Sequence, residues 1–192
     1  MAGLVTYVIL FRGVGGATQL PTAPLRQALA EAGFTDVATY INSGNAILRS
    51  HLPRGEVIAT IAALCRQKFG FTKDIHAPTL AEWRRLVRAN PYPEAEGEGR
   101  NLHAAILAAA PKPADVAALR ALANAGEGIE VIGRVAYILT PGGVSGSKMA
   151  ARFDKGIGVP NTARNWNTVR RLLAMAEAAD GQARAATKTG EV

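Results

Sequence analysis

The sequence predicts an α+β protein made of two ferredoxin-like subdomains, each with an antiparallel sheet, followed by a C-terminal helix. Residues 4–76 show the element order β-α-β-β-α-β of the split βαβ fold, and the order β-α-β-β-α recurs from residue 102. An irregular loop containing Pro and Gly, residues 90–100, separates the two runs. We therefore expect an N-terminal subdomain over residues 1–78, a second subdomain over 79–180 and a disordered tail over 181–192.

The first half opens with a strand over residues 4–11, because this run is almost entirely β-prone and apolar, as in a strand buried on both faces. Pro21 opens a helix whose apolar residues recur at helical spacing until Gly33 ends it. The polar, Gly-centred residues 42–45 indicate a hairpin turn. The other predicted elements of this half are strands over residues 37–41 and 46–49, a helix over 54–68 and a short strand over 71–76.

The second half nearly repeats this order after a helix over residues 80–89. A last helix, over residues 166–179, has its apolar residues on one face, so we expect it to dock on a core. The elements between them are a strand over residues 102–107, a helix over 113–123, strands over 129–132 and 135–139, and a helix over 148–155.

The composition indicates a folded domain without a membrane segment. The 192 residues are 48% hydrophobic, enough for one large core or two small ones. No apolar run approaches the roughly 20 residues of a transmembrane helix. No Lys or Arg precedes the first apolar run, as it would in a signal peptide, so the sequence predicts a cytoplasmic protein with no membrane partner. The single cysteine, Cys65, lies in a helical apolar pattern and is expected in the core.

The formal net charge of +7 attracts polyanions, but most of the positive residues are scattered Arg residues, so charge alone selects no partner. One hypothesis is nucleic-acid binding by a basic sheet or helix surface, assisted by Arg164, Arg170 and Arg171, and it predicts steep salt dependence. Base stacking on a sheet needs exposed aromatic rings. The candidate rings on the predicted strands are Tyr7, Phe11, Tyr40 and Tyr137.

The residue pattern assigns no metal site and no nucleophile. His51, His76 and His103 lie on separate elements without ligand spacing, and no Cys pair exists for zinc. No pair of carboxylates occurs at a predicted strand end, so no residue receives a catalytic role. We expect no metal and no cofactor, and the sequence leaves open whether the protein is an enzyme.

Two loops in the first half are candidate ligand sites. The loop after the first strand combines a cation with glycines whose backbone N–H groups can hold a phosphate or carboxylate, although it matches neither the dinucleotide fingerprint nor the P-loop. Its candidate residues are Arg12, Gly13, Gly15 and Gly16. The hairpin turn offers the polar residues Asn42, Ser43 and Asn45. Each loop also has a purely structural explanation. The first can be a tight connection that needs glycine, and the second can be a plain hairpin turn.

Two helix starts in the second half are also candidates. Ser147 can cap the helix that begins at Lys148, where a cation in the first turn is unfavourable unless an anion is bound. The start of the last helix has more polar groups than one cap needs. These candidates are Arg164, Asn165, Trp166, Asn167 and Thr168. The structural alternative is that Thr162 or Asn165 caps this helix and Trp166 packs beneath it.

Four motifs are specific in combination. They are Phe-Arg-Gly-Val-Gly-Gly at residues 11–16, the block at residues 32–45 that ends in Tyr-Ile-Asn-Ser-Gly-Asn, Ser-Lys at residues 147–148, and the segment at 162–172 with Arg-Asn-Trp-Asn-Thr. Together they resemble the bacterial family called domain of unknown function 1697, over nearly the whole chain. The resemblance implies paired α+β subdomains and no established activity. The loop after the first strand is two residues shorter here than the usual family form, Arg-Gly-Ile-Asn-Val-Gly-Gly.

These patterns lead to the hypothesis that the protein binds a phosphate- or carboxylate-bearing small molecule in a cleft between the subdomains. Nucleic-acid binding is one alternative. A structural or homo-oligomeric protein without a ligand, in which the polar motifs join the two halves, is another. The residues expected to converge on the cleft are Arg12, Asn42, Asn45, Lys148, Arg164 and Asn167.

Overall fold

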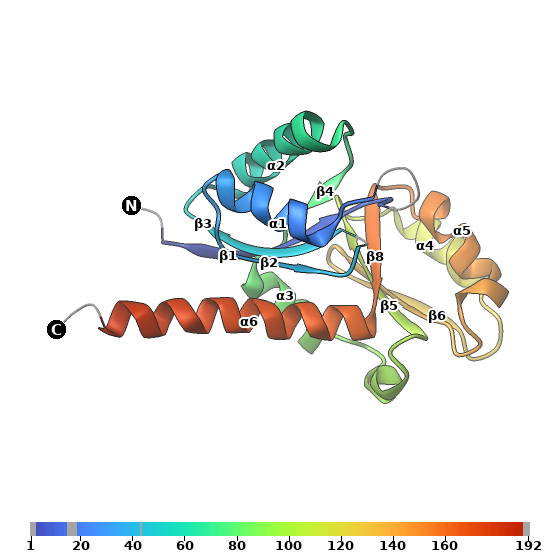
Figure 1. Cartoon of the computed structure of the whole chain (residues 1–192). Coiled ribbons are helices and arrows are strands. Elements are labelled where there is room, and N and C mark those ends of the chain that lie inside the picture. The colour runs from blue at the N-terminus through green and yellow to red at the C-terminus, as the bar shows by residue number, and fades with distance from the viewer. Residues whose placement is uncertain (1–2, 15–18, 43, 190–192) are drawn as a thin grey trace. The chain divides into compact units, whose positions relative to one another are not determined.

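The computed structural model describes residues 3–14, 19–42 and 44–189, with side chains up to residue 181. The chain forms two compact units, Met1–Arg84 with Arg171–Val192, and Arg85–Arg170. Each unit has a four-stranded antiparallel sheet with helices, which confirms the predicted α+β class (Figure 1). The divisions between the units fall within α3 (Leu80–Arg88) and α6 (Trp166–Thr189). Among the described residues, no helix combines the length and apolar character needed to cross a membrane.

The first unit has the split βαβ arrangement that the element order predicted. Its strands lie in the order β2-β3-β1-β4, and all neighbours are antiparallel. The chain passes through β1 (Val5–Phe11), α1 (Thr22–Glu31), β2 (Thr35–Tyr40), β3 (Asn45–Ser50), α2 (Arg54–Phe69) and β4 (Ile75–His76).

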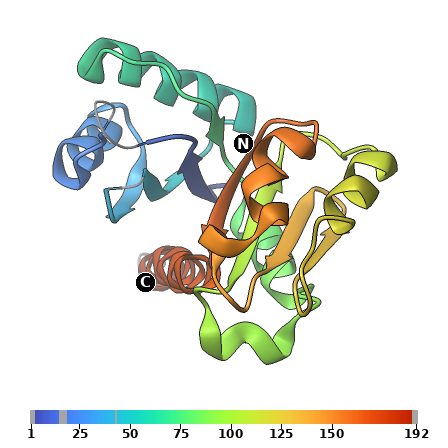
Figure 2. The ribbon, with the colours of Figure 1, turned by 90° about the vertical axis from the view of Figure 1, so that its right-hand side faces the viewer.

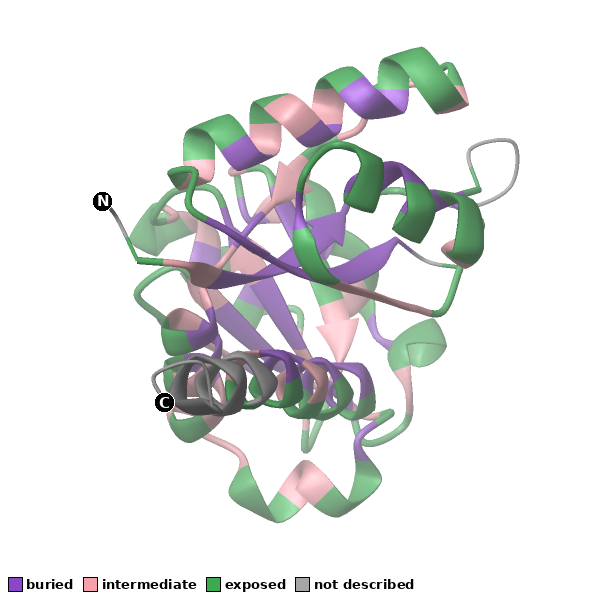
Figure 3. Ribbon diagram, turned by 60° about the vertical axis from the view of Figure 1, so that its left-hand side comes forward, coloured by how far each residue is buried: buried purple, intermediate pink, exposed green. Residues whose placement is uncertain are grey.

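The central strand β1 is buried on both faces, which explains its nearly continuous apolar sequence. Tyr7, Ile9 and Phe11 lie in the core formed with α1 and α2. The alternate residues Val8 and Leu10 are also fully buried. Figure 3 shows much of this sheet in the purple of buried residues. Both faces of this strand therefore need a covering layer.

The covering of the second face involves the part of α6 that belongs to the first unit. Thr6, which alternation places on that face of β1, donates to the Asp180 carboxylate at 3.3 Å. Arg84 of α3 forms an ion pair with Glu177 at 2.9 Å. α6 continues to Thr189, through residues that the sequence analysis assigned to a disordered tail.

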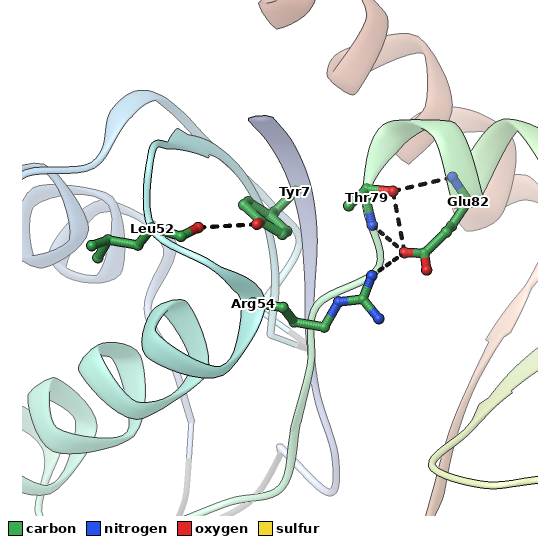
Figure 4. Close-up of polar contacts among 5 residues, drawn as sticks. All are labelled: Tyr7, Leu52, Arg54, Thr79 and Glu82. Carbon is green, nitrogen blue, oxygen red and sulfur yellow. Dashed lines mark hydrogen bonds and ion pairs between the residues drawn. The ribbon is translucent and has the colours of Figure 1, made fainter. Parts of the chain in front are cut away.

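Figure 4 shows a polar clamp between α2 and α3, defined here as Arg54, Thr79 and Glu82. Thr79 and Glu82 form a capping box, in which the Thr79 backbone N–H donates to the carboxylate at 2.8 Å and the Glu82 N–H donates to the Thr79 hydroxyl at 3.3 Å. Arg54, at the start of α2, donates to the same carboxylate oxygen at 2.5 Å. Burial raises the pKa of Glu82, but the hydrogen bonds from Arg54 and Thr79 outweigh it, so the net pKa is lowered.

We expect Glu82→Gln to lower the free energy of unfolding at pH 7, because it removes the negative charge to which Arg54 and Thr79 donate. The expected loss is only about 1 kcal/mol, because the clamp is partly exposed and solvent weakens it. The folded-state pKa lies below the unfolded value of about 4.3, so the contribution is complete above that pH and is lost as pH falls through the folded pKa. Urea unfolding of the wild type and of Glu82→Gln, at neutral and at acidic pH, measures the difference in their free energies of unfolding. Glu94→Gln, at an exposed carboxylate, is the control, and an equal deficit at both pH values would contradict the prediction.

The second unit has the same arrangement, with strands in the order β6-β7-β5-β8. Helices α4 and α5 cover one face of this sheet (Figure 2), and the core between them includes Leu119, Ala136, Met149 and Phe153. The elements are η1 (Pro93–Glu98), β5 (Leu102–Leu107), α4 (Pro113–Arg120), β6 (Gly128–Ile132), β7 (Val135–Leu139), η2 (Val144–Gly146), α5 (Lys148–Gly156) and β8 (Asn161–Asn165).

Strand β8 was not predicted. Its sequence, Asn-Thr-Ala-Arg-Asn, has no apolar pattern, yet it pairs with β5 from Asn161↔Leu107 to Asn165↔His103. The apolar partner strand therefore supplies the order that the local sequence lacks. With β8, the second unit also has the complete order β-α-β-β-α-β.

Arginine side chains cover a carbonyl on each outer strand of the second sheet. The Ala108 N–H bonds the Pro160 C=O, and hydrogen-bonded pairs alternate along an antiparallel ladder, so the Ala163 C=O points away from β5. Arg164 donates to that carbonyl at 2.8 Å.

By the same rule, the Ile129 C=O of β6 points away from β7, because its partner Ile138 directs its backbone groups to β5. Arg120 of α4 donates to that carbonyl at 3.0 Å and forms an ion pair with Glu130 at 2.7 Å. Covered edges are poorer templates for pairing with another chain.

We expect Arg120→Ala to increase self-association, because the outer edge of β6 then offers an uncovered carbonyl to a strand of a second copy. Light scattering after size-exclusion chromatography, over a wide range of protein concentrations, measures the molar mass against the wild type. Arg134→Ala removes the same charge from an exposed position and is the control. An unchanged mass for Arg120→Ala would contradict this role of the side chain.

Candidate functional site

The loop that leaves β1 lies beside the segment that enters β4. The Arg12 N–H donates to the Asp74 C=O at 3.0 Å, which continues the β1–β4 ladder one step beyond Phe11↔Ile75. Gly13 then has a positive φ of 63°, a conformation that glycine adopts without strain. The ladder therefore ends where Arg12 and Gly13 lie opposite residues 73–74.

These segments form a surface pocket of about 280 Å³, which we call the Arg12 pocket. A Cβ atom placed on Gly13 would lie 3.7 Å from the Lys73 Nζ atom, so the ammonium group lies close to the turn. The Arg12 guanidinium lies 3.6 Å from the Asp74 carboxylate. Two cations and one carboxylate thus share the pocket. Its lining residues are Arg12, Gly13, Thr72, Lys73 and Asp74.

Sequence reasoning selected Arg12 and Gly13 but missed Thr72, Lys73 and Asp74. It assigned residues 71–76 to one strand, whereas β4 comprises only Ile75–His76. The missed signal is the register: once β4 pairs with β1, Asp74 must lie opposite Arg12. The predicted candidates Gly15 and Gly16 lie outside the described residues, as does Ser43.

The hairpin turn lies against the loop that contains Arg12. The Phe11 N–H donates to the Gly44 C=O at 2.9 Å. A Cβ atom placed on Gly44 would lie 2.8 Å from the Phe11 Cβ atom and 2.9 Å from a Val14 methyl group. Asn45 is buried and donates to the Tyr40 C=O at 3.2 Å, which stabilises the turn, while Asn42 is exposed. The structure therefore brings the two predicted loops of the first half together.

The second unit uses Ser147 as a helix cap. Its hydroxyl accepts from the Ala150 N–H at 3.0 Å at the start of α5 and donates to Glu127 at 2.9 Å. Ser147 is buried, whereas Lys148 is exposed. The capping alternative for Ser147 is thus confirmed, and Lys148 as an anion ligand stays a prediction.

The polar segment before α6 has extensive structural roles. The Asn165 carboxamide oxygen accepts from the Thr168 N–H at 2.9 Å and caps α6, as one alternative predicted. Trp166 is fully buried, with its ring 6.4 Å from that of Tyr137. A Cβ atom placed on Gly99 would overlap the Asn167 carboxamide, so these residues are in close contact.

Arg164 lies in β8 rather than in a loop. It donates to the Thr162 hydroxyl at 2.7 Å and to the Ala163 carbonyl. Burial lowers the pKa of the Arg164 guanidinium to about 10. These contacts give this residue a structural function, and its participation in a site with Arg12, Asn42, Asn45, Lys148 and Asn167 stays a prediction.

The aromatic rings considered for base stacking are mostly buried. Tyr7, Phe11 and Tyr137 are each at most 4% exposed. Tyr40 is partly buried, and the Arg171 guanidinium carbon lies 5.9 Å from its ring centroid. Three of the four candidate rings are therefore inaccessible to a nucleobase.

The described residues contain no group of three or more His, Cys, Asp or Glu side chains that could hold a metal ion. Cys65 packs in the first unit's core, as predicted, and burial raises the pKa of its thiol to about 11. The thiol is therefore protonated at neutral pH and is a poor nucleophile.

We expect Gly44→Ala to destabilise the first unit by about 1–3 kcal/mol more than Gly70→Ala, because the new methyl group overlaps Phe11 and Val14. Gly70 has the same φ of 72° with open space around it, so the difference isolates packing from backbone strain. Urea unfolding of both variants measures it. Equal losses would show that the turn moves away from the loop at little cost.

A family model described as "Protein of unknown function (DUF1697)" matches residues 4–137. No curated protein matches the chain. The solved structure of the conserved bacterial protein SP0830 from Streptococcus pneumoniae is similar with a TM-score of 0.63, at 18% sequence identity, over 91% of this chain and 99% of that chain. At this identity the likeness shows the fold alone. Since the family model matches well over half of the sequence, the protein belongs to the DUF1697 family, as its combined motifs predicted.

Proposed function

We propose that this protein binds a small molecule through a phosphate or carboxylate group in the Arg12 pocket. One observation carries the proposal: two cationic side chains, Arg12 and Lys73, line a single surface hollow beside a glycine turn. Thr72, whose side chain carries a hydroxyl donor, lines the same hollow. The proposal keeps the ligand class predicted from the sequence and rests on residues of the first unit alone.

The residue types suit an oxyanion. A guanidinium presents parallel N–H groups that match two oxygens of a carboxylate or phosphate, and an ammonium adds a compact charge. The Arg12 side chain is 34% exposed, so it is accessible to a ligand while part of it is shielded from water. The net charge of +7 raises the local concentration of small anions around the protein.

Nucleic-acid binding receives less support. Its sheet-surface form depends on stacking rings, and Tyr7, Phe11 and Tyr137 are buried. A nucleic acid needs an extended basic surface, whereas a small anion needs only one pocket. Binding of a small anion is therefore the better supported function.

Titration of the ¹⁵N-labelled full chain with inorganic phosphate, at constant ionic strength, should shift the amide signals of Gly13 and Lys73 in a saturable way. The double variant Arg12→Gln/Lys73→Gln should weaken this binding more than about tenfold, because hydrogen bonds to charged groups each contribute roughly 1.5–3 kcal/mol.

The control is Arg26→Gln/Arg66→Gln, which removes the same charge from exposed positions on α1 and α2 of the same unit. It should bind phosphate as the wild type does. Equal weakening in both double variants would mean that only net charge matters, and unsaturable shifts in the wild type would overturn the proposed site.

A further inference from the structure

We infer that Asp74 makes the Arg12 pocket selective for anions that carry a hydroxyl or ammonium donor next to the charged group. This inference rests on the proposed function and names the ligand class of the same site. It starts from the one feature of the pocket that an anion site does not need, which is a carboxylate beside the two cations.

The register of β1 with the chain before β4 brings Asp74 to the pocket. The Arg12 N–H and the Asp74 C=O are hydrogen-bonded, so the two residues lie directly opposite and their side chains project to the same face. The backbone pairing therefore places the Asp74 side chain on the same face as the Arg12 side chain.

The Arg12–Asp74 contact is loose. The Nη1–Oδ2 distance is 3.6 Å, well beyond the 2.7–2.9 Å of a charge-assisted hydrogen bond. The Asp74 side chain is 64% exposed. An exposed carboxylate in a loose pair retains acceptor capacity toward a ligand.

Charge then determines which ligands the pocket favours. The two cations attract an oxyanion, while Asp74 repels it. A hydroxyl or ammonium group on the ligand converts that repulsion into a hydrogen bond or an ion pair. The pocket volume of about 280 Å³ lies at the lower limit for small-molecule sites, so the ligand has few heavy atoms. Small hydroxy acids, amino acids and phosphate monoesters with a neighbouring donor meet these conditions.

The experiment compares probes that differ only in the donor. The full chain is titrated with propionate, lactate and alanine, and with ethyl phosphate, 2-hydroxyethyl phosphate and 2-aminoethyl phosphate, with the Gly13 and Lys73 amide shifts as the readout. Within each series the wild type should bind a donor-bearing probe about three- to fivefold tighter than the plain anion. The hydroxyl and ammonium arms show which donor Asp74 prefers.

Asp74→Asn should act in opposite directions on the two kinds of probe. It should tighten binding of propionate and ethyl phosphate, because the repulsion is removed, and it should reduce the preference for donors to within about twofold. A merely structural role of Asp74 would weaken every probe alike. Glu56→Gln, which removes an exposed carboxylate from the same unit, should leave all affinities unchanged.

Two outcomes overturn the inference and differ in what else they remove. If plain anions bind as tightly as donor-bearing probes, or if Asp74→Asn weakens both alike, the inference is wrong and the anion site stands. If neither inorganic phosphate nor any probe shifts Gly13 and Lys73 in a saturable way, the proposed function fails with it.

Discussion

The burial of β1 on both faces is the constraint on which the first unit depends. A strand with apolar side chains on each face needs a layer on each side, and its backbone needs a partner strand on each edge. β3 and β4 provide the edges, and α1 and α2 cover one face. The buried strand ends at Phe11, and Arg12 adds one more step to its ladder before the chain leaves the sheet. The Arg12 pocket lies at that exit because β4 pairs with the end of β1.

Most of the fold could be predicted because its elements have strong local signals. The run at β1 and the turn before β3 identify the first unit, and the repeated order identifies the second. β8 could not be predicted, because it contains Asn, Thr and Arg and owes its conformation to β5. The continuation of α6 to Thr189 was also missed. Its Ala-rich sequence favours a helix, but the local sequence does not indicate what that helix contacts.

The candidate site was only half predictable, for a related reason. Arg12 and Gly13 follow a recognisable strand, so their place at a loop could be predicted from the sequence. Lys73 and Asp74 belong to the pocket through the register of a two-residue strand, which no local pattern reveals. Conversely, the polar residues from Arg164 to Thr168 suggested a ligand. In the structure an edge carbonyl, a helix cap and the core account for Arg164, Asn165 and Trp166.

The placement of the later part of α6 in the first unit determines when that unit can be completed during synthesis. Thr6 and its partner Asp180 are 174 residues apart, and the whole second unit is translated between them. At 5–20 residues per second, roughly 9–35 s pass before the helix residue follows the strand residue from the ribosome. During that interval Thr6 lacks its partner on α6, so the face of β1 that carries Thr6, Val8 and Leu10 is completed last. The incomplete unit is meanwhile exposed to chaperones and to neighbouring chains.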